Sequence, residues 1–140
     1  MLSKILVALL MLVAVAFTGW AQGGSTAADG IPRITIDELK AKMDKKEKVV
    51  VVDVRSHVVS KIEGALLIPY ADLEKNLDKL PKDKLIVTVC SCATEGTSGR
   101  AVQILKQKGY TQVAALKGGQ TAWEIAKYPT EVVKEEIPAQ

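Results

Sequence analysis

The stretch LIVTVCSCATEGTSGR, at residues 85–100, carries both the pattern that predicts the fold and the residues with the most reactive chemistry. Residues 85–89 form a short apolar run rich in β-branched side chains, which is typical of a strand buried on both faces. Residues 91–97 are small and polar and predict a loop. A helix is expected to begin at Ser98 or Gly99. A buried strand, a loop and a helix in this order form the repeating unit of a parallel sheet.

The same unit recurs along the chain. Further strands are expected at residues 49–52, 65–68 and 113–116, and Thr35 with Glu38 forms a capping-box pattern that opens a helix. Helical spacing recurs over residues 70–80, and Gly118-Gly119 leads into a last helix that Pro129 ends. The sequence therefore predicts an α/β fold with a central, mainly parallel sheet of four or five strands and helices on both faces.

Composition excludes several classes of protein. The 140 residues are 48% hydrophobic and 25% charged, as in a globular domain. The net charge of +3 has no basic block, so no nucleic-acid partner is expected. Two cysteines and one histidine are too few for a disulfide framework or a Cys/His zinc site. Neither a metal nor a cofactor is expected.

The first 21 residues predict a signal peptide. Lys4 precedes an uninterrupted apolar run at residues 5–17, which is shorter than the ~18–20 residues needed to cross a bilayer. Gly19-Trp20-Ala21 fits a cleavage site with small residues at its two ends. We therefore expect export to the periplasm or the medium, with no stable membrane span after cleavage. An uncleaved N-terminal anchor is the alternative.

The remaining chain divides into three predicted parts. Residues 22–30 are small and polar and predict a flexible tether. Residues 31–130 form the predicted domain, and residues 131–140 a loose C-terminal tail.

Cys90 lies at the carboxyl end of the predicted strand 85–89, where parallel sheets place their ligands. A following helix N-terminus favours a thiolate at this position, because its partial positive charge and free N–H groups stabilise the ionised sulfur. The loop from Ser91 to Gly99 can surround an anion with backbone donors. These features predict a nucleophilic thiol beside an anion-binding loop. A buried structural cysteine is the competing interpretation.

The sequence resembles a single-domain rhodanese, a sulfurtransferase-like domain, over residues 34–129. The resemblance rests on an ordered series of short motifs: VVDVR (51–55), IEGA (62–65) with Ile68-Pro69, LPKDK (80–84), IVTVC (86–90), Ser98, KGY (108–110), and LKGG (116–119) with Ala122-Trp123. It implies an α/β fold and a loop cysteine that takes a sulfane sulfur, a sulfur bonded to another sulfur, from a donor. The resulting persulfide passes that sulfur to a nucleophilic acceptor, without a cofactor.

Two cysteines compete for the nucleophile's role. In the resembled family, six residues commonly run from the cysteine up to the serine that opens the helix. This loop has six when counted from Cys92 and eight from Cys90. We take Cys90 as the predicted nucleophile because the strand places it, with Cys92 as the alternative. The loop also has Glu95 where the family usually has a basic residue, so a preference for thiosulfate is not implied.

The predicted site combines the nucleophile with its surroundings. Asp53 and Arg55 resemble the family's Asp-x-Arg and are expected to support the pocket, although a purely structural ion pair is the alternative. The predicted partners are a small sulfur-containing anion or persulfide and a thiol acceptor protein. The expected substrate-binding residues are Ser91, Cys92, Ala93, Thr94, Glu95, Gly96, Thr97, Ser98 and Arg100.

Three functions remain open on the sequence alone. The first is an exported sulfurtransferase that moves sulfane sulfur from thiosulfate or a persulfide to a thiol or cyanide-type acceptor. The second is a non-catalytic binding or sulfur-carrier module, and the third is a redox protein that uses the Cys90/Cys92 pair. A phosphatase is disfavoured, because the position six residues after Cys92 is Ser98 rather than the arginine of a Cys-x5-Arg loop.

Overall fold

The computed structural model describes residues 25–134. The predicted signal peptide therefore lies outside the described residues, as does most of the predicted tail. Among residues 25–134, no helix is both long and apolar enough to cross a bilayer.

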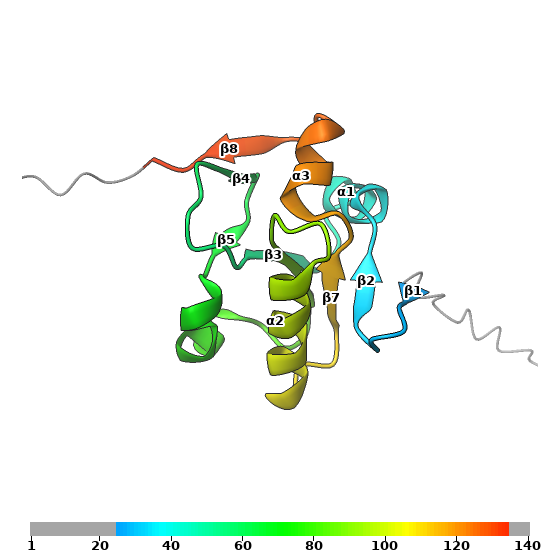
Figure 1. Ribbon diagram of the computed structural model, residues 1–140, viewed down its shortest axis with the longest axis vertical. Helices are drawn as coiled ribbons and strands as arrows, with labels where there is room; N and C mark the ends of the chain where they lie inside the picture. Colours follow the sequence, from blue (N-terminus) through cyan, green and yellow to red (C-terminus); the bar gives the residue numbers. More distant parts are fainter. Residues whose placement is uncertain (1–24, 135–140) are drawn as a thin grey trace, which may run out of the picture.

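A twisted parallel sheet forms the centre of the molecule (Figure 1). Its strand order is β1-β2-β7-β6-β3-β5, and every neighbouring pair is parallel except β1 and β2. The strands are β1 (Ser25–Thr26), β2 (Pro32–Ile34), β3 (Val49–Asp53), β5 (Leu66–Leu67), β6 (Leu85–Val89) and β7 (Val113–Leu116). The five parallel strands confirm the predicted sheet, and β1 adds an antiparallel edge.

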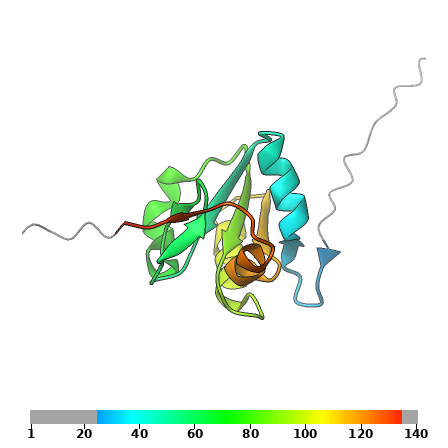
Figure 2. The ribbon, with the colours of Figure 1, turned by 90° about the horizontal axis from the view of Figure 1, so that it is seen from above.

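Helices cover both faces of the sheet, as predicted (Figures 1 and 2). On one face, α2 (Gly96–Gln107) and the 3-10 helix η1 (Tyr70–Lys79) pack through Leu105 and Leu73. On the other, α1 (Ile36–Asp44) and α3 (Gly119–Ile125) pack through Leu39 and Trp123. The β-branched strands alternate between these two cores because successive side chains of a strand point to opposite faces.

Local signals place several of these elements. The predicted capping box is present at α1: the Thr35 Oγ1 accepts from the Glu38 N–H at 3.2 Å, and the Glu38 carboxylate accepts from the Thr35 N–H at 2.9 Å. The predicted helix at residues 70–80 is a 3-10 helix interrupted by non-helical backbone at Asn76.

A second, two-stranded antiparallel sheet pairs β4 (Ser60–Ile62) with β8 (Thr130–Val132). The sequence predicts a loop at residues 60–62 and places the end of the domain at residue 130. The structure extends regular pairing to Val132, inside the segment predicted as a tail. Similarly, β1 lies inside the segment predicted as a tether. These short strands carry too little local pattern to be recognised before their partners are known.

The start of α2 differs from the prediction: the helix begins at Gly96 rather than at Ser98 or Gly99. Glu95, directly before it, has left-handed backbone, with φ of +49°. Its carboxylate forms an ion pair with Arg33 and accepts a hydrogen bond from the Gly118 N–H. These distant contacts hold the turn that starts the helix.

Candidate active site

The reactive loop begins at the carboxyl end of β6. Alternation along this strand places Val89 on the α1/α3 face and Cys90 on the α2 face, where Cys90 is only 3% exposed. The Cys90 carbonyl accepts a hydrogen bond of 2.9 Å from the Gln120 N–H at the start of α3. The first residue of the loop is therefore tied to a neighbouring helix.

Gly119 permits this close approach. Its backbone has φ of +57°, and a Cβ at this position would lie 2.0 Å from the Cys90 carbonyl oxygen. Only glycine combines left-handed backbone with so short a distance at no steric cost. The Gly118-Gly119 pair therefore supports the reactive loop through its backbone.

Glu95 anchors the other end of the loop. Its side chain accepts from Arg33 Nε at 3.1 Å and from the Gly118 N–H at 2.8 Å, and Arg33 is itself held by Asp29 at 2.7 Å. This chain of contacts joins the loop to β2 and to the β7–α3 turn. The sequence predicts that Glu95 contacts substrate. In the structure Glu95 is buried, and its carboxylate binds Arg33 and the Gly118 N–H instead.

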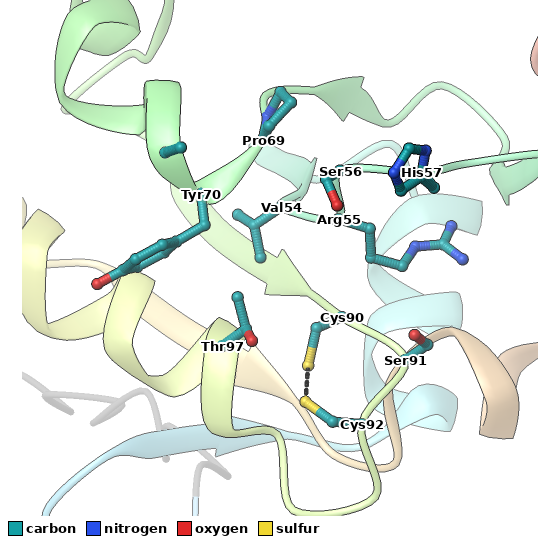
Figure 3. A pocket seen from close by; sticks show the side chains of 11 residues that line it. Val54, Arg55, Ser56, His57, Pro69, Tyr70, Cys90, Ser91, Cys92 and Thr97 are labelled. Atoms are coloured by element: carbon teal, nitrogen blue, oxygen red, sulfur yellow. Dashed lines mark hydrogen bonds between the residues drawn. The ribbon is translucent and has the colours of Figure 1, made fainter.

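The two thiols face one another across the loop (Figure 3). Their Sγ atoms lie 2.7 Å apart, and both cysteines are free. The single Cys90 S–H can point either to Ser98 Oγ, at 3.4 Å, or to the Cys92 sulfur, and the Ser98 hydroxyl donates to the Glu95 carbonyl at 3.1 Å. Cys92 is half-buried, whereas Cys90 is enclosed.

The ionisation of Cys92 is favoured by its surroundings. Burial raises the pKa of this thiol, but hydrogen bonds from the Cys90 thiol and from the backbone N–H groups of Thr97 and Gly96 outweigh that effect. The net result is a Cys92 pKa below its ordinary value of 9.0. The N–H groups of Gly96 and Thr97 belong to the first turn of α2, which has no helical partner for them.

A cleft of about 440 Å³ opens over the two thiols (Figure 3). This volume suits a small ligand. Most of the cleft lining comes from residues that follow the carboxyl ends of β3, β5 and β6, and Thr97 of α2 completes it. The lining residues are Val54, Arg55, Ser56, His57, Pro69, Tyr70, Ala71, Cys90, Ser91, Cys92 and Thr97.

Arg55 brings positive charge to the cleft wall, but a carboxylate is bound to it. Its guanidinium contacts the Asp53 carboxylate at 2.6 and 2.9 Å and donates to the Ser60 carbonyl at 2.7 Å. Asp53 is 1% exposed and lies behind the cleft rather than in it. The pair therefore positions Arg55 and offsets much of its charge.

The predicted substrate-binding residues divide into three groups. Ser91, Cys92 and Thr97 line the cleft, whereas Glu95 and Ser98 are buried behind the loop. The others lie outside the cleft lining: Ala93, Thr94, Gly96 and Arg100, the last with its guanidinium 5.8 Å from the centre of the Tyr70 ring.

Sequence reasoning missed one side of the cleft. The local sequence marks Pro69 and Tyr70 only as the end of a predicted strand and the start of a predicted helix, and it favours a solvent-exposed position for the single histidine, His57. His57 is exposed, and it lies at the cleft. The signal available was position: Pro69 and Tyr70 directly follow a parallel strand, at the same edge of the sheet as Cys90.

An ionisable thiol beside helix N–H groups, at the carboxyl edge of a parallel sheet, is an arrangement typical of proteins that use a nucleophilic thiolate. Among residues 25–134, no group of three or more His, Cys, Asp or Glu side chains could hold a metal ion. The chain belongs to the rhodanese-like domain family, whose sequence model matches residues 35–126.

Known relatives place the chain in a sulfur-transfer family. It is 32% identical over 118 residues to a Mycobacterium tuberculosis protein named "Probable adenylyltransferase/sulfurtransferase MoeZ", covering 81% of this chain and 29% of that protein. It is 29% identical over 96 residues to an Allochromatium vinosum protein named "Sulfurtransferase", covering 66% of this chain and 88% of the relative. The chain thus spans less than a third of the length of MoeZ.

A solved structure shows the same fold. The rhodanese-like domain of an Anabaena protein superimposes with a TM-score of 0.65 at 25% sequence identity, covering 77% of this chain and 85% of that one. The expected resemblance to rhodaneses is confirmed at the levels of family and fold.

Proposed function

We propose that this protein is a sulfurtransferase in which Cys92 carries the transferred sulfur as a persulfide. One observation carries the proposal: Cys92 is the more exposed of the two thiols at the cleft, and the N–H groups of Gly96 and Thr97 at the start of α2 help to lower its pKa. Cys90, the residue preferred on sequence grounds, borders the same cleft but is only 3% exposed, with Ser98 Oγ 3.4 Å from its sulfur. Accessibility and anion stabilisation together favour Cys92 as the attacking thiolate.

The reaction has two displacement steps. The Cys92 thiolate attacks the sulfane sulfur of the donor, forms a new S–S bond and breaks the donor's own bond to that sulfur. With thiosulfate the leaving group is sulfite, and with a small-molecule persulfide it is a thiolate. An acceptor nucleophile then attacks the outer sulfur of the persulfide and regenerates the Cys92 thiolate. The loop N–H groups stabilise the negative charge both of the free Cys92 thiolate and of the Cys92 persulfide.

Charge at the cleft supports a persulfide donor over thiosulfate. Arg55 is already paired with Asp53, and Arg100 lies outside the cleft lining, so the described residues offer little uncompensated positive charge. A dianion loses more solvation than a monoanion on entering such a cleft. We therefore propose as the preferred donor a persulfide, whose reacting group carries a single negative charge, and a thiol as the acceptor.

Mass spectrometry of the intact, reduced protein tests this function. Immediately after a brief exposure to glutathione persulfide, the wild-type protein and Cys90→Ser should each have gained one sulfur atom, whereas Cys92→Ser should gain none. Loading that depends on Cys90 and not on Cys92 would overturn the assigned nucleophile. Absence of loading in all three proteins would leave a non-catalytic binding module as the better description.

We also propose that the protein is exported. Lys4, the apolar run at residues 5–17 and the small residues around Trp20 support this assignment. N-terminal sequencing of protein recovered from the periplasm or the medium should begin at Gln22. Recovery of the uncleaved chain from the membrane fraction would support the anchor instead.

A further inference from the structure

We propose that Cys90 is a resolving thiol, which releases the sulfur carried by Cys92 as hydrogen sulfide and leaves a Cys90–Cys92 disulfide. The inference rests on the proposed function, because it begins from the Cys92 persulfide. It adds an outcome that needs no external acceptor: the protein itself reduces the sulfane sulfur that it has captured.

The arrangement of the two sulfurs separates their roles. Cys92 lines the open cleft and is half-buried, so a donor reaches it directly. Cys90 also borders this cleft but is only 3% exposed, and its sulfur lies 2.7 Å from that of Cys92. An enclosed thiol in contact with the carrier sulfur can act on what the carrier holds while meeting external donors much less often.

Neighbouring groups hold Cys90 in place for this attack. Its thiol can donate to Ser98 Oγ, which in turn donates to the Glu95 carbonyl, and its own carbonyl is fixed by the Gln120 N–H. A nucleophile already at contact distance reacts as if at very high concentration, so the internal step competes with acceptors that must first enter the cleft.

The step balances without a further reagent. The persulfide is Cys92–Sγ–Sδ⁻, in which Sδ is the transferred atom. Cys90 Sγ attacks Cys92 Sγ, an Sγ–Sγ bond forms, and the Sγ–Sδ bond breaks with its electron pair on Sδ. Sδ takes the Cys90 proton and leaves as HS⁻. The transferred sulfur is reduced to sulfide, and the two cysteine sulfurs are oxidised to the disulfide. A dithiol reductant then restores both thiols.

A single-turnover experiment tests this role. Fully reduced protein is loaded with one equivalent of glutathione persulfide, desalted at once and left without reductant. Wild-type protein should lose the added sulfur, release one equivalent of sulfide and end two hydrogen atoms lighter than the reduced chain. Its rate should not change on dilution, because the reaction is intramolecular.

Variants separate the inference from the function beneath it. Cys90→Ser and Cys90→Ala should keep the added sulfur and release sulfide at least ~10-fold more slowly. Two substitutions are used, with thermal unfolding recorded for each, because position 90 is buried. A wild-type protein that stays persulfidated as long as Cys90→Ser overturns the resolving role and leaves the sulfurtransferase intact. A Cys90→Ser protein that never loads sulfur overturns both.

Discussion

In the proposed function, the ionisation of Cys92 governs reactivity at the site. Since its pKa is lowered, the thiolate fraction at neutral pH exceeds that of an ordinary cysteine and falls only as the pH drops through the lowered value. The rate of Cys92 alkylation by iodoacetamide, followed by peptide mass spectrometry, should therefore reach its half-maximum at a pH below 9.0.

The hydrogen bond from Cys90 contributes to that shift, so its removal should move the profile. Cys90→Ala removes the donor and should raise the midpoint, whereas Cys90→Ser retains a hydroxyl donor and should raise it less. Identical profiles in the two variants would show that the backbone N–H groups alone stabilise the thiolate.

Gly119 is the position at which the site cannot accommodate any side chain. Gly119→Ala introduces a Cβ 2.0 Å from the Cys90 carbonyl at a φ of +57°. We expect the free energy of unfolding to fall by more than ~2 kcal/mol, in denaturant titration, with slower loading of Cys92.

Gly64 offers a matched control. It also has a positive φ, of +76°, but a Cβ there meets nothing within 4 Å. Gly64→Ala should cost about 1 kcal/mol, from backbone conformation alone, and leave the site reactive. Equal losses in the two variants would mean that the contact with Cys90 adds nothing.

The sequence could place a thiol at the sheet edge but could not choose between the two cysteines. The β-branched run ending at Val89 is a local signal, and it locates Cys90 correctly at the end of a buried strand. Which sulfur meets the N–H groups depends on the turn at Glu95. Arg33, which holds that turn, is 62 residues distant in the chain, and no local pattern reveals the contact.

At the scale of elements, the ion pair of Glu95 and Arg33 fixes the position of α2 relative to β2. Glu95→Gln keeps the shape and the hydrogen bond from Gly118 but removes the charge from a largely buried pair. We expect a loss of ~1–2 kcal/mol in the free energy of unfolding and slower alkylation of Cys92, because the loop loses its anchor.

The exposed pair of Lys40 and Asp44 on α1 provides the comparison. Asp44 is largely accessible to solvent, so Asp44→Asn should cost less than ~0.5 kcal/mol and leave alkylation unchanged. If Glu95→Gln behaves in the same way, the loop is held by its backbone contacts rather than by charge.

Elements with strong local patterns were predictable, whereas short paired strands were not. The capping box of α1 and the β-branched runs of β3 and β6 are complete within a few residues. By contrast, β4 and β8 are three residues each, and their pairing joins segments about 70 residues apart. Their stability is tertiary, and their composition resembles that of a loop.

For the molecule as a whole, the two sheets should differ in local stability. Strands β3 and β6 are covered on both faces, whereas β4 and β8 form three residue pairs and leave Val59 and Val132 largely exposed. Amide hydrogen exchange, measured by mass spectrometry, should be much faster in β4 and β8 than in β3 and β6. Equal protection would contradict this division.

Local unfolding of β4 and β8 would also alter the cleft, because Arg55 in the cleft wall donates a hydrogen bond to the carbonyl of Ser60 in β4. Faster exchange at β4 in a Glu131→Gln variant, which loses the ion pair with Lys61, would confirm that this pair closes the second sheet.

The contact between the Cys90 and Cys92 sulfurs also determines which thiol-binding inhibitors can act on the protein. Trivalent arsenicals bind two thiolates at once, and soft thiolate donors favour such thiophilic centres. Phenylarsine oxide should therefore inactivate the wild-type protein in a form reversible by a dithiol but not by a monothiol, and Cys90→Ser should resist it. Inhibition that persists in that variant would place the arsenic on Cys92 alone. The closeness of the two thiols, which would serve sulfur transfer, would thus also make the protein sensitive to trivalent arsenic.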